Sequence, residues 1–112
     1  MGFVAHHAII VTSWEWKHLR RAQREAKRLG MSVTNKIQGP VNAYRSFLIG
    51  PDGSKEGWED SDIGDKRREE WKAFVVREKL WVEWVEVNYG SDLEGGDTVT
   101  DGRFNYPEED DE

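Results

Sequence analysis

Hydrophobic side chains in this chain change their spacing along the sequence in the order strand, helix, strand, strand, helix, strand. The spacing predicts four strands and two helices. The strands are expected over residues 3–12, 32–38, 44–50 and 81–89, and the helices over residues 13–29 and 65–79. Two βαβ-like halves in one short chain are typical of an α+β fold, the ferredoxin-like βαββαβ two-layer sandwich, in which two helices cover one face of an antiparallel sheet. This pattern constrains the fold while saying little about chemistry.

The first predicted strand and helix have the clearest patterns. The strand is apolar on both faces, as in a central strand that is covered on both sides. Thr12 and Glu15 have the spacing of a capping box at the start of the helix. The predicted buried stripe of this helix is Leu19, Ala22, Ala26 and Leu29.

Charge is distributed unevenly along the 112 residues, whose formal net charge is -6. Residues 1–50 hold eight Lys or Arg against two Glu, a net charge of +6. Past Tyr89, nine Asp or Glu stand against Arg103, a net charge of -8. We therefore expect one domain over residues 1–89 and an acidic, mobile C-terminal tail over residues 90–112.

Composition also limits the class of protein. There are no cysteines, so disulfides and thiolate metal sites are excluded. No apolar run approaches the roughly 20 residues that span a bilayer, and the N-terminus lacks a signal-peptide pattern. The expected location is the cytoplasm, without membrane contact.

A basic row is predicted on the first helix. Its members are Lys17, Arg21, Arg24 and Arg28, which share one direction opposite the buried stripe. Such a row could bind phosphate backbones or an acidic partner, or could be an ordinary solvated helix face. The acidic tail could compete for it.

Histidines and carboxylates offer little support for catalysis. His6 and His7 point to opposite faces of a strand, so they cannot share one metal ion or flank one substrate. The acidic stretch of residues 56–65 lacks the order of an EF-hand loop, and its carboxylates can instead serve a helix N-terminus. No catalytic residue, metal site or cofactor is predicted. A phosphate-ester hydrolase that uses one histidine with Asp60, Asp62 or Asp65 remains a minor alternative.

Six tryptophans exceed the needs of one small core. In the last strand Trp84 alternates with Val85 and Val87, which predicts that Trp84 lies on the sheet face opposite the helices, joined there by Tyr44 and Leu48. An exposed apolar face usually marks a partner or a ligand. Homodimerisation by sheet packing is one explanation, a stacking platform for a nucleotide is another, and docking of the tail is a third.

Four short blocks resemble a small uncharacterised family found in phage and prophage genomes. They are His6-His7-Ala8-Ile9, Ser46-Phe47, Ser61-Asp62 and the run Pro-Asp-Gly-Ser-Lys-Glu-Gly-Trp at 51–58. The resemblance spans residues 4–89 and implies no activity. It does imply a context, since small phage proteins often inhibit a host component or sequester a defence signal.

The sequence therefore predicts a small non-enzymatic binding protein, dimeric, that inhibits a host protein or sequesters a nucleotide-like signal. The expected recognition residues are Tyr44, Arg45, Trp58, Trp84, His6 and His7. The alternative is a nucleic-acid-associated module that uses the basic row, although the third strand carries no aromatic signature of an RNA-recognition module.

Overall fold

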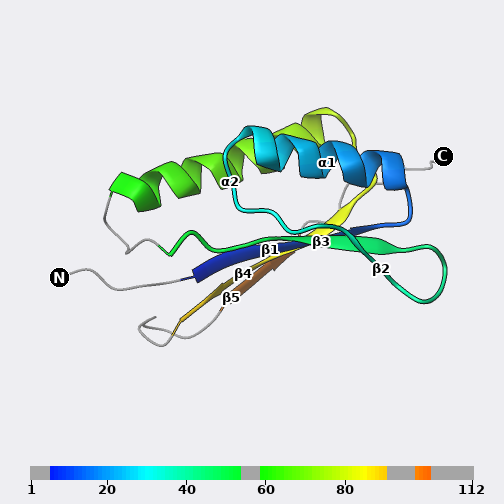
Figure 1. Ribbon diagram of the computed structural model, residues 1–112. Coiled ribbons are helices and arrows are strands. Elements are labelled where there is room, and N and C mark those ends of the chain that lie inside the picture. The colour runs from blue at the N-terminus through cyan, green and yellow to red at the C-terminus, as the bar shows by residue number, and fades with distance from the viewer. Residues whose placement is uncertain (1–5, 54–58, 91–97, 102–112) are drawn as a thin grey trace.

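A five-stranded antiparallel sheet and two helices make up the part of the chain that the computed structural model describes, which is residues 6–53, 59–90 and 98–101. The elements are β1 (His6–Ser13), α1 (Trp16–Arg28), β2 (Ile37–Gln38), β3 (Arg45–Ile49), α2 (Glu59–Arg77), β4 (Glu83–Tyr89) and β5 (Thr98–Asp101). The strand order is β2-β3-β1-β4-β5, and every neighbouring pair is antiparallel. Both helices lie on the same face of the sheet (Figure 1). Within the described residues, neither helix has the length and apolar character needed to cross a membrane.

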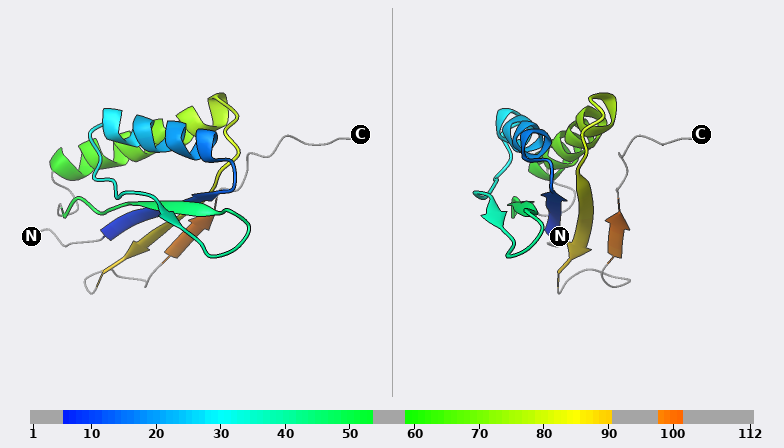
Figure 2. Two further views of the ribbon diagram at one scale, coloured as in Figure 1. Left: turned by 45° about the vertical axis from the view of Figure 1, so that its right-hand side comes forward. Right: turned by 90° about the vertical axis from the view of Figure 1, so that its right-hand side faces the viewer.

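The predicted α+β class, with an antiparallel sheet and two helices, is confirmed. The strand count and order differ from the predicted four-stranded βαββαβ arrangement, because β5 is added beside β4 (Figure 2). The sequence Thr98-Val99-Thr100 lies in the segment expected to be a mobile tail, yet it pairs with β4. β-Branched residues favour extended backbone, and the acidic composition of the surrounding segment concealed this signal. The short strand considered over residues 55–58 lies outside the described residues.

The core lies between the sheet and the two helices. Its members are Ile9, Val11, Leu19, Ala22, Ala26, Phe47, Ile49, Trp71, Val75, Leu80 and Val82. Trp71 is the largest fully buried side chain, and its indole Nε1 donates a hydrogen bond to the carbonyl oxygen of Ala22 at 2.9 Å. This bond joins α2 to α1, so Trp71 connects both helices to the sheet beneath them.

The faces of β4 are the reverse of the prediction. Across the β1–β4 pair, Trp84 is opposite the buried Val11, whereas Val85 is opposite Ile10. Trp84 packs against the core and therefore faces the helices, and Val85 and Val87 face the other way. On the helix-facing side of β4, Glu86 has partners from α2, whereas the buried Oδ1 atom of Asn88 has no hydrogen-bond partner among the described residues.

The sheet face opposite the helices is aliphatic rather than aromatic. The register places on it Ala8, Ile10, Leu48, Val85, Val87, Tyr89 and Val99. Ile10 is 43% exposed, so the expectation that β1 is covered on both faces is wrong among the described residues. We call this set the far face.

Helix α1 has the predicted buried stripe but a different N-terminal cap. Leu19, Ala22 and Ala26 are fully buried. The capping box does not form: the Glu15 side chain accepts a hydrogen bond from the backbone of Lys17, and Thr12 instead bonds Ser46 across β1 and β3 at 2.8 Å. Thr12 is still within the strand, where its hydroxyl is closer to the neighbouring strand than to the first helical turn.

Helix α2 begins six residues before the predicted start, at Glu59 rather than at residue 65. Glu59, Asp60 and Asp62 occupy its first turn, where their negative charges interact favourably with the positive end of the helix dipole. Ser61 and Gly64 are buried on the inner side of this extra stretch. Neither residue is apolar enough to show the helical period in the sequence.

Candidate functional site

The six predicted recognition residues do not meet in one place. His6 lies at one end of β1, where its ring is 5.2 Å from that of Tyr89. Arg45 is paired with Ser13 at the other end of β1, a separation of about 23 Å at 3.3 Å per residue. His7 faces the helices, Tyr44 precedes Arg45, Trp84 is partly buried beside Trp71, and Trp58 lies outside the described residues. Within this set, Tyr44 and Arg45 are close only because they are neighbours in the sequence, as His6 and His7 are.

Trp84 contributes to the packing of α2. Its ring meets that of Trp71 edge-on, with the centroids 6.2 Å apart, and the Nζ atom of Lys72 is 5.3 Å from its centroid. A ring held in this way between a helix and the sheet has no open face on the far side. It cannot serve there as a stacking platform.

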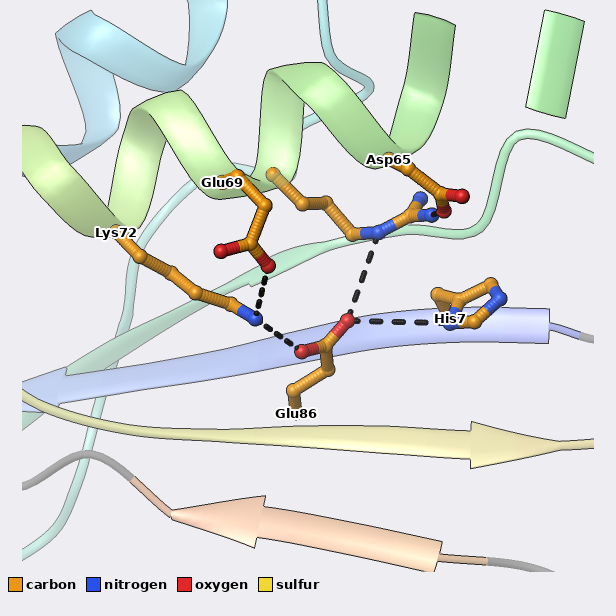
Figure 3. Close-up of polar contacts among 6 residues, drawn as sticks. His7, Asp65, Glu69, Lys72 and Glu86 are labelled. Carbon is orange, nitrogen blue, oxygen red and sulfur yellow. Dashed lines mark hydrogen bonds and ion pairs between the residues drawn. The ribbon is translucent and has the colours of Figure 1, made fainter. Parts of the chain in front are cut away.

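A cluster of charged side chains joins α2 to β4 around Glu86 (Figure 3). The Glu86 carboxylate accepts a hydrogen bond from Lys72 Nζ at 2.5 Å and pairs with Arg68 Nε at 3.5 Å. His7 Nδ1 is 3.8 Å from the same carboxylate, and Lys72 also bonds Glu69 at 3.0 Å. A half-buried carboxylate is stable on this face because two cations of α2 neutralise it.

The pKa of Lys72 reflects this arrangement. Burial lowers the pKa, but the hydrogen bonds to Glu86 and Glu69 outweigh burial, so the pKa lies above its ordinary value of 10.5. A raised lysine pKa stabilises the fold below the unfolded-state pKa, and this contribution is lost as the pH rises through the folded-state pKa.

Lys72→Met is therefore expected to lower the free energy of unfolding at pH 7 by about 1–3 kcal/mol, because Glu86 loses its closest partner. Above pH 10.5 the difference between the wild type and the variant should shrink as Lys72 loses its proton. Urea unfolding at pH 7 and pH 11 measures both values. An unchanged difference at the two pH values would contradict this role for Lys72.

The cluster contains two residues of the phosphate-ester hydrolase alternative, His7 and Asp65. Figure 3 shows His7 on β1 lying below Asp65 of α2, so these two candidates lie in the same region. Asp65, however, is paired with Arg68, and Glu86 lies beside His7. The side chains pair with one another and form an interface between helix and sheet.

This cluster does not gather metal ligands among the described residues. Among residues 6–53, 59–90 and 98–101, no group of three or more His, Asp or Glu side chains could hold a metal ion. A hollow of about 50 Å³ lies between the end of α1 and the start of α2, near Gly30 and Arg68. That volume has room for a few water molecules at most.

The basic row of α1 is present, but two of its four cations are paired. Arg21 donates to Glu78 at 2.7 Å, and Arg28 forms two hydrogen bonds with Glu25, at 2.9 and 2.6 Å. These arginines lower the pKa of Glu78 and of Glu25, chiefly through their hydrogen bonds. Within the described residues, the side chains of Lys17 and Arg24 form no ion pair.

A shallow hollow of about 290 Å³ lies on the outer side of α1. Its lining is Trp16, Lys17, Arg20, Arg21 and Arg24. No carboxylate lines it, and Arg20, like Arg24, has no acidic partner among the described residues. The hollow therefore combines a concentrated positive charge with one aromatic ring.

Positive charge continues from the hollow toward β2 and β3. Burial lowers the pKa of Lys36, and the positive charges of Lys27, Arg20 and Arg45 lower it further. Lys36 donates a hydrogen bond to the neutral side chain of Gln23 at 2.8 Å. The bond to Gln23 places Lys36 beside α1, and the pairing of Gln38 with Arg45 places β3 next to the segment that carries Lys36. We call Lys27, Lys36 and Arg45, together with the hollow, the basic surface.

The sequence reasoning found part of the basic surface and missed the rest. The single helical direction selected Lys17, Arg21, Arg24 and Arg28 and omitted Arg20 and Lys27, which lie toward β2 and β3. Lys36 joins α1 only through the fold, in its hydrogen bond to Gln23. Trp16 could have indicated this surface from the sequence, because it lies outside the apolar stripe of the helix and could therefore be expected to be exposed, as it is.

No family model and no curated protein sequence matches this chain. Functional reasoning therefore depends on the geometry described above.

Proposed function

We propose that this protein is a binding module that holds the phosphate backbone of a nucleic acid on its basic surface. The observation that carries the proposal is the hollow on α1, where Lys17, Arg20, Arg21 and Arg24 converge without a carboxylate in the lining. Clustered cations of this kind attract phosphates and release their counterions. The nucleic-acid alternative from the sequence becomes the leading proposal, because its residues lie together whereas the other recognition set is scattered.

The exposed cations explain how the overall negative charge is compatible with this activity. Electrostatic attraction at a surface acts over about a Debye length, roughly 10 Å at 0.1 M salt, so the local charge decides binding. Arg21 can contribute although it is paired with Glu78, since that ion pair is exposed and therefore weak. The four cations of the hollow are thus available to phosphates.

A salt titration tests the proposal. With four phosphates of a single strand neutralised, the logarithm of the binding constant should fall against the logarithm of salt concentration with a slope of about -3, a loss of about 50-fold between 50 and 200 mM. Fluorescence anisotropy of a labelled 20-nucleotide strand measures this slope. No binding at 50 mM salt, or a slope near zero, would sink the proposal.

A nucleotide-like ligand is a second candidate for the same hollow. In this hollow one aromatic ring, that of Trp16, lies beside four cations that could bind the phosphates of a nucleotide. Competition of mononucleotides against the labelled strand tests it. Displacement at micromolar concentration favours the nucleotide, and displacement only by longer strands favours nucleic acid.

Other features predicted from the sequence remain proposals. We retain the ferredoxin-like architecture as a proposal in which β5 is an addition to the edge of a four-stranded sheet. Homodimerisation now concerns the far face, where Ile10 and Val99 are exposed and could contact a second copy, and molar mass in solution tests it. Phage origin, inhibition of a host protein and a cytoplasmic location stay predictions.

A further inference from the structure

Three exposed aromatic side chains lie at the end of the molecule where α1 begins. Trp16, the first residue of α1, is 44% exposed and lines the hollow beside the four cations. Trp14 is 42% exposed and Tyr44 is 37% exposed. The pairing of Ser13 with Arg45 brings the residues that follow Ser13 to the same end of the sheet as Tyr44. Three aromatic rings and the densest positive charge thus share one region.

Trp16 lies at the edge of the buried face of α1, about 20° from the buried Gln23 at 100° per residue. Its ring is nevertheless 44% exposed, and the core already contains the fully buried Trp71. Trp16 has the Nζ atom of Lys17 at 5.9 Å from its ring centroid. A tryptophan ring that is nearly half exposed beside cations can accept a flat partner on its free surface.

Neighbouring contacts make this end of the molecule firm. The Trp81 ring contacts two others: its centroid is 5.5 Å from that of the Trp14 ring and 5.6 Å from that of the His18 ring. His18 Nδ1 also accepts a hydrogen bond from the backbone of Trp81 at 2.8 Å. The start of α1 is therefore fixed to the segment that precedes β4, and Trp16 projects from a fixed turn.

We propose that the nucleic acid held on the basic surface is single-stranded, with one base stacked on Trp16 and adjacent phosphates on Lys17, Arg20 and Arg24. This inference rests on the proposed function and names its substrate class. A duplex offers phosphates, but its bases are already stacked inside, so Trp16 would have no partner. Single strands expose both groups, and binding sites for them combine aromatic platforms with a basic groove.

The test compares three labelled ligands of 20 nucleotides: a thymidine strand, an abasic strand with the same backbone, and a duplex. Wild-type protein should bind the thymidine strand about 5- to 150-fold more tightly than the abasic strand, which is the usual range for stacking of one base. Trp16→Ala should remove this preference and leave the affinity for the abasic strand unchanged. Tyr89→Ala is the matched control for loss of an exposed aromatic ring, since Tyr89 is 38% exposed and pairs with His6 at the opposite end of β1. Circular dichroism checks that each variant is folded.

The outcomes separate this inference from the function on which it rests. Equal, salt-dependent binding of all three ligands would overturn the single-strand inference while supporting a nucleic-acid-binding module. Retention of the base preference in Trp16→Ala would overturn the role of Trp16. Absence of binding by every ligand at 50 mM salt would overturn the proposed function itself.

Discussion

Trp71→Ala is expected to lower the free energy of unfolding by about 3–5 kcal/mol, the usual cost of removing a large buried aromatic side chain. Trp71 is fully buried, donates to the carbonyl oxygen of Ala22, and supports the ring of Trp84. The variant loses packing on three sides and leaves the Ala22 carbonyl without its indole partner. Urea unfolding followed by far-ultraviolet circular dichroism measures the loss.

Trp14→Ala is the control for this prediction. Trp14 is 42% exposed and contacts Trp81 at the surface, so its removal should cost less than about 1.5 kcal/mol. Similar losses for the two variants would show that Trp71 is not the centre of the packing between α1, α2 and the sheet.

The double variant Arg20→Glu/Arg24→Glu is expected to bind a 20-nucleotide strand at least about 100-fold more weakly than the wild type at 50 mM salt. Both arginines line the hollow and lack an acidic partner among the described residues, so each reversal removes one attraction and adds one repulsion. Because both side chains are exposed, the free energy of unfolding should change by less than about 0.5 kcal/mol each.

Lys66→Glu provides the matched comparison for the single variant Arg24→Glu. Each changes the net charge by the same amount on an exposed helical position, but Lys66 lies on α2 and outside the hollow. Arg24→Glu should weaken binding by about tenfold more than Lys66→Glu. Equal effects would mean that net charge, rather than the basic surface, governs binding.

The elements of the fold could be predicted well because their local patterns agree with their packing. The stripe of Leu19, Ala22 and Ala26 has the period of a helix with one buried face, and the structure buries it. The apolar run of β1 likewise marks the central strand, which pairs with both β3 and β4.

The orientation of β4 could not be predicted from alternation. Val85 and Val87 suggest a buried face, and Glu86 suggests an exposed one, but the structure has the reverse. The carboxylate of Glu86 is accommodated because Lys72 and Arg68 reach it from α2. Lys72 and Glu86 are 14 positions apart and lie on different elements, so the alternation of residues within β4 cannot indicate their contact.

The basic surface shows the same limit at the level of the site. Helical spacing places Arg21 in the same basic row as Arg24. In the structure, however, Arg21 donates a hydrogen bond to Glu78, which is 57 residues away in the sequence. Conversely, Lys36 and Arg45 join the surface only through the fold. The sequence could therefore indicate a basic helix, but only the tertiary structure shows which of its cations are paired and which cations from other elements join them.

Nuclear magnetic resonance mapping of a bound single strand tests the central claim most directly. A 20-nucleotide thymidine strand is titrated into the isotopically labelled protein, and backbone amide shifts are followed residue by residue. The largest changes should fall on the first half of α1, from Trp16 to Arg24, with smaller changes at Lys36 and Arg45. Changes confined to the far face, around Ile10 and Val87, or no changes at all, would contradict a nucleic-acid site on the basic surface.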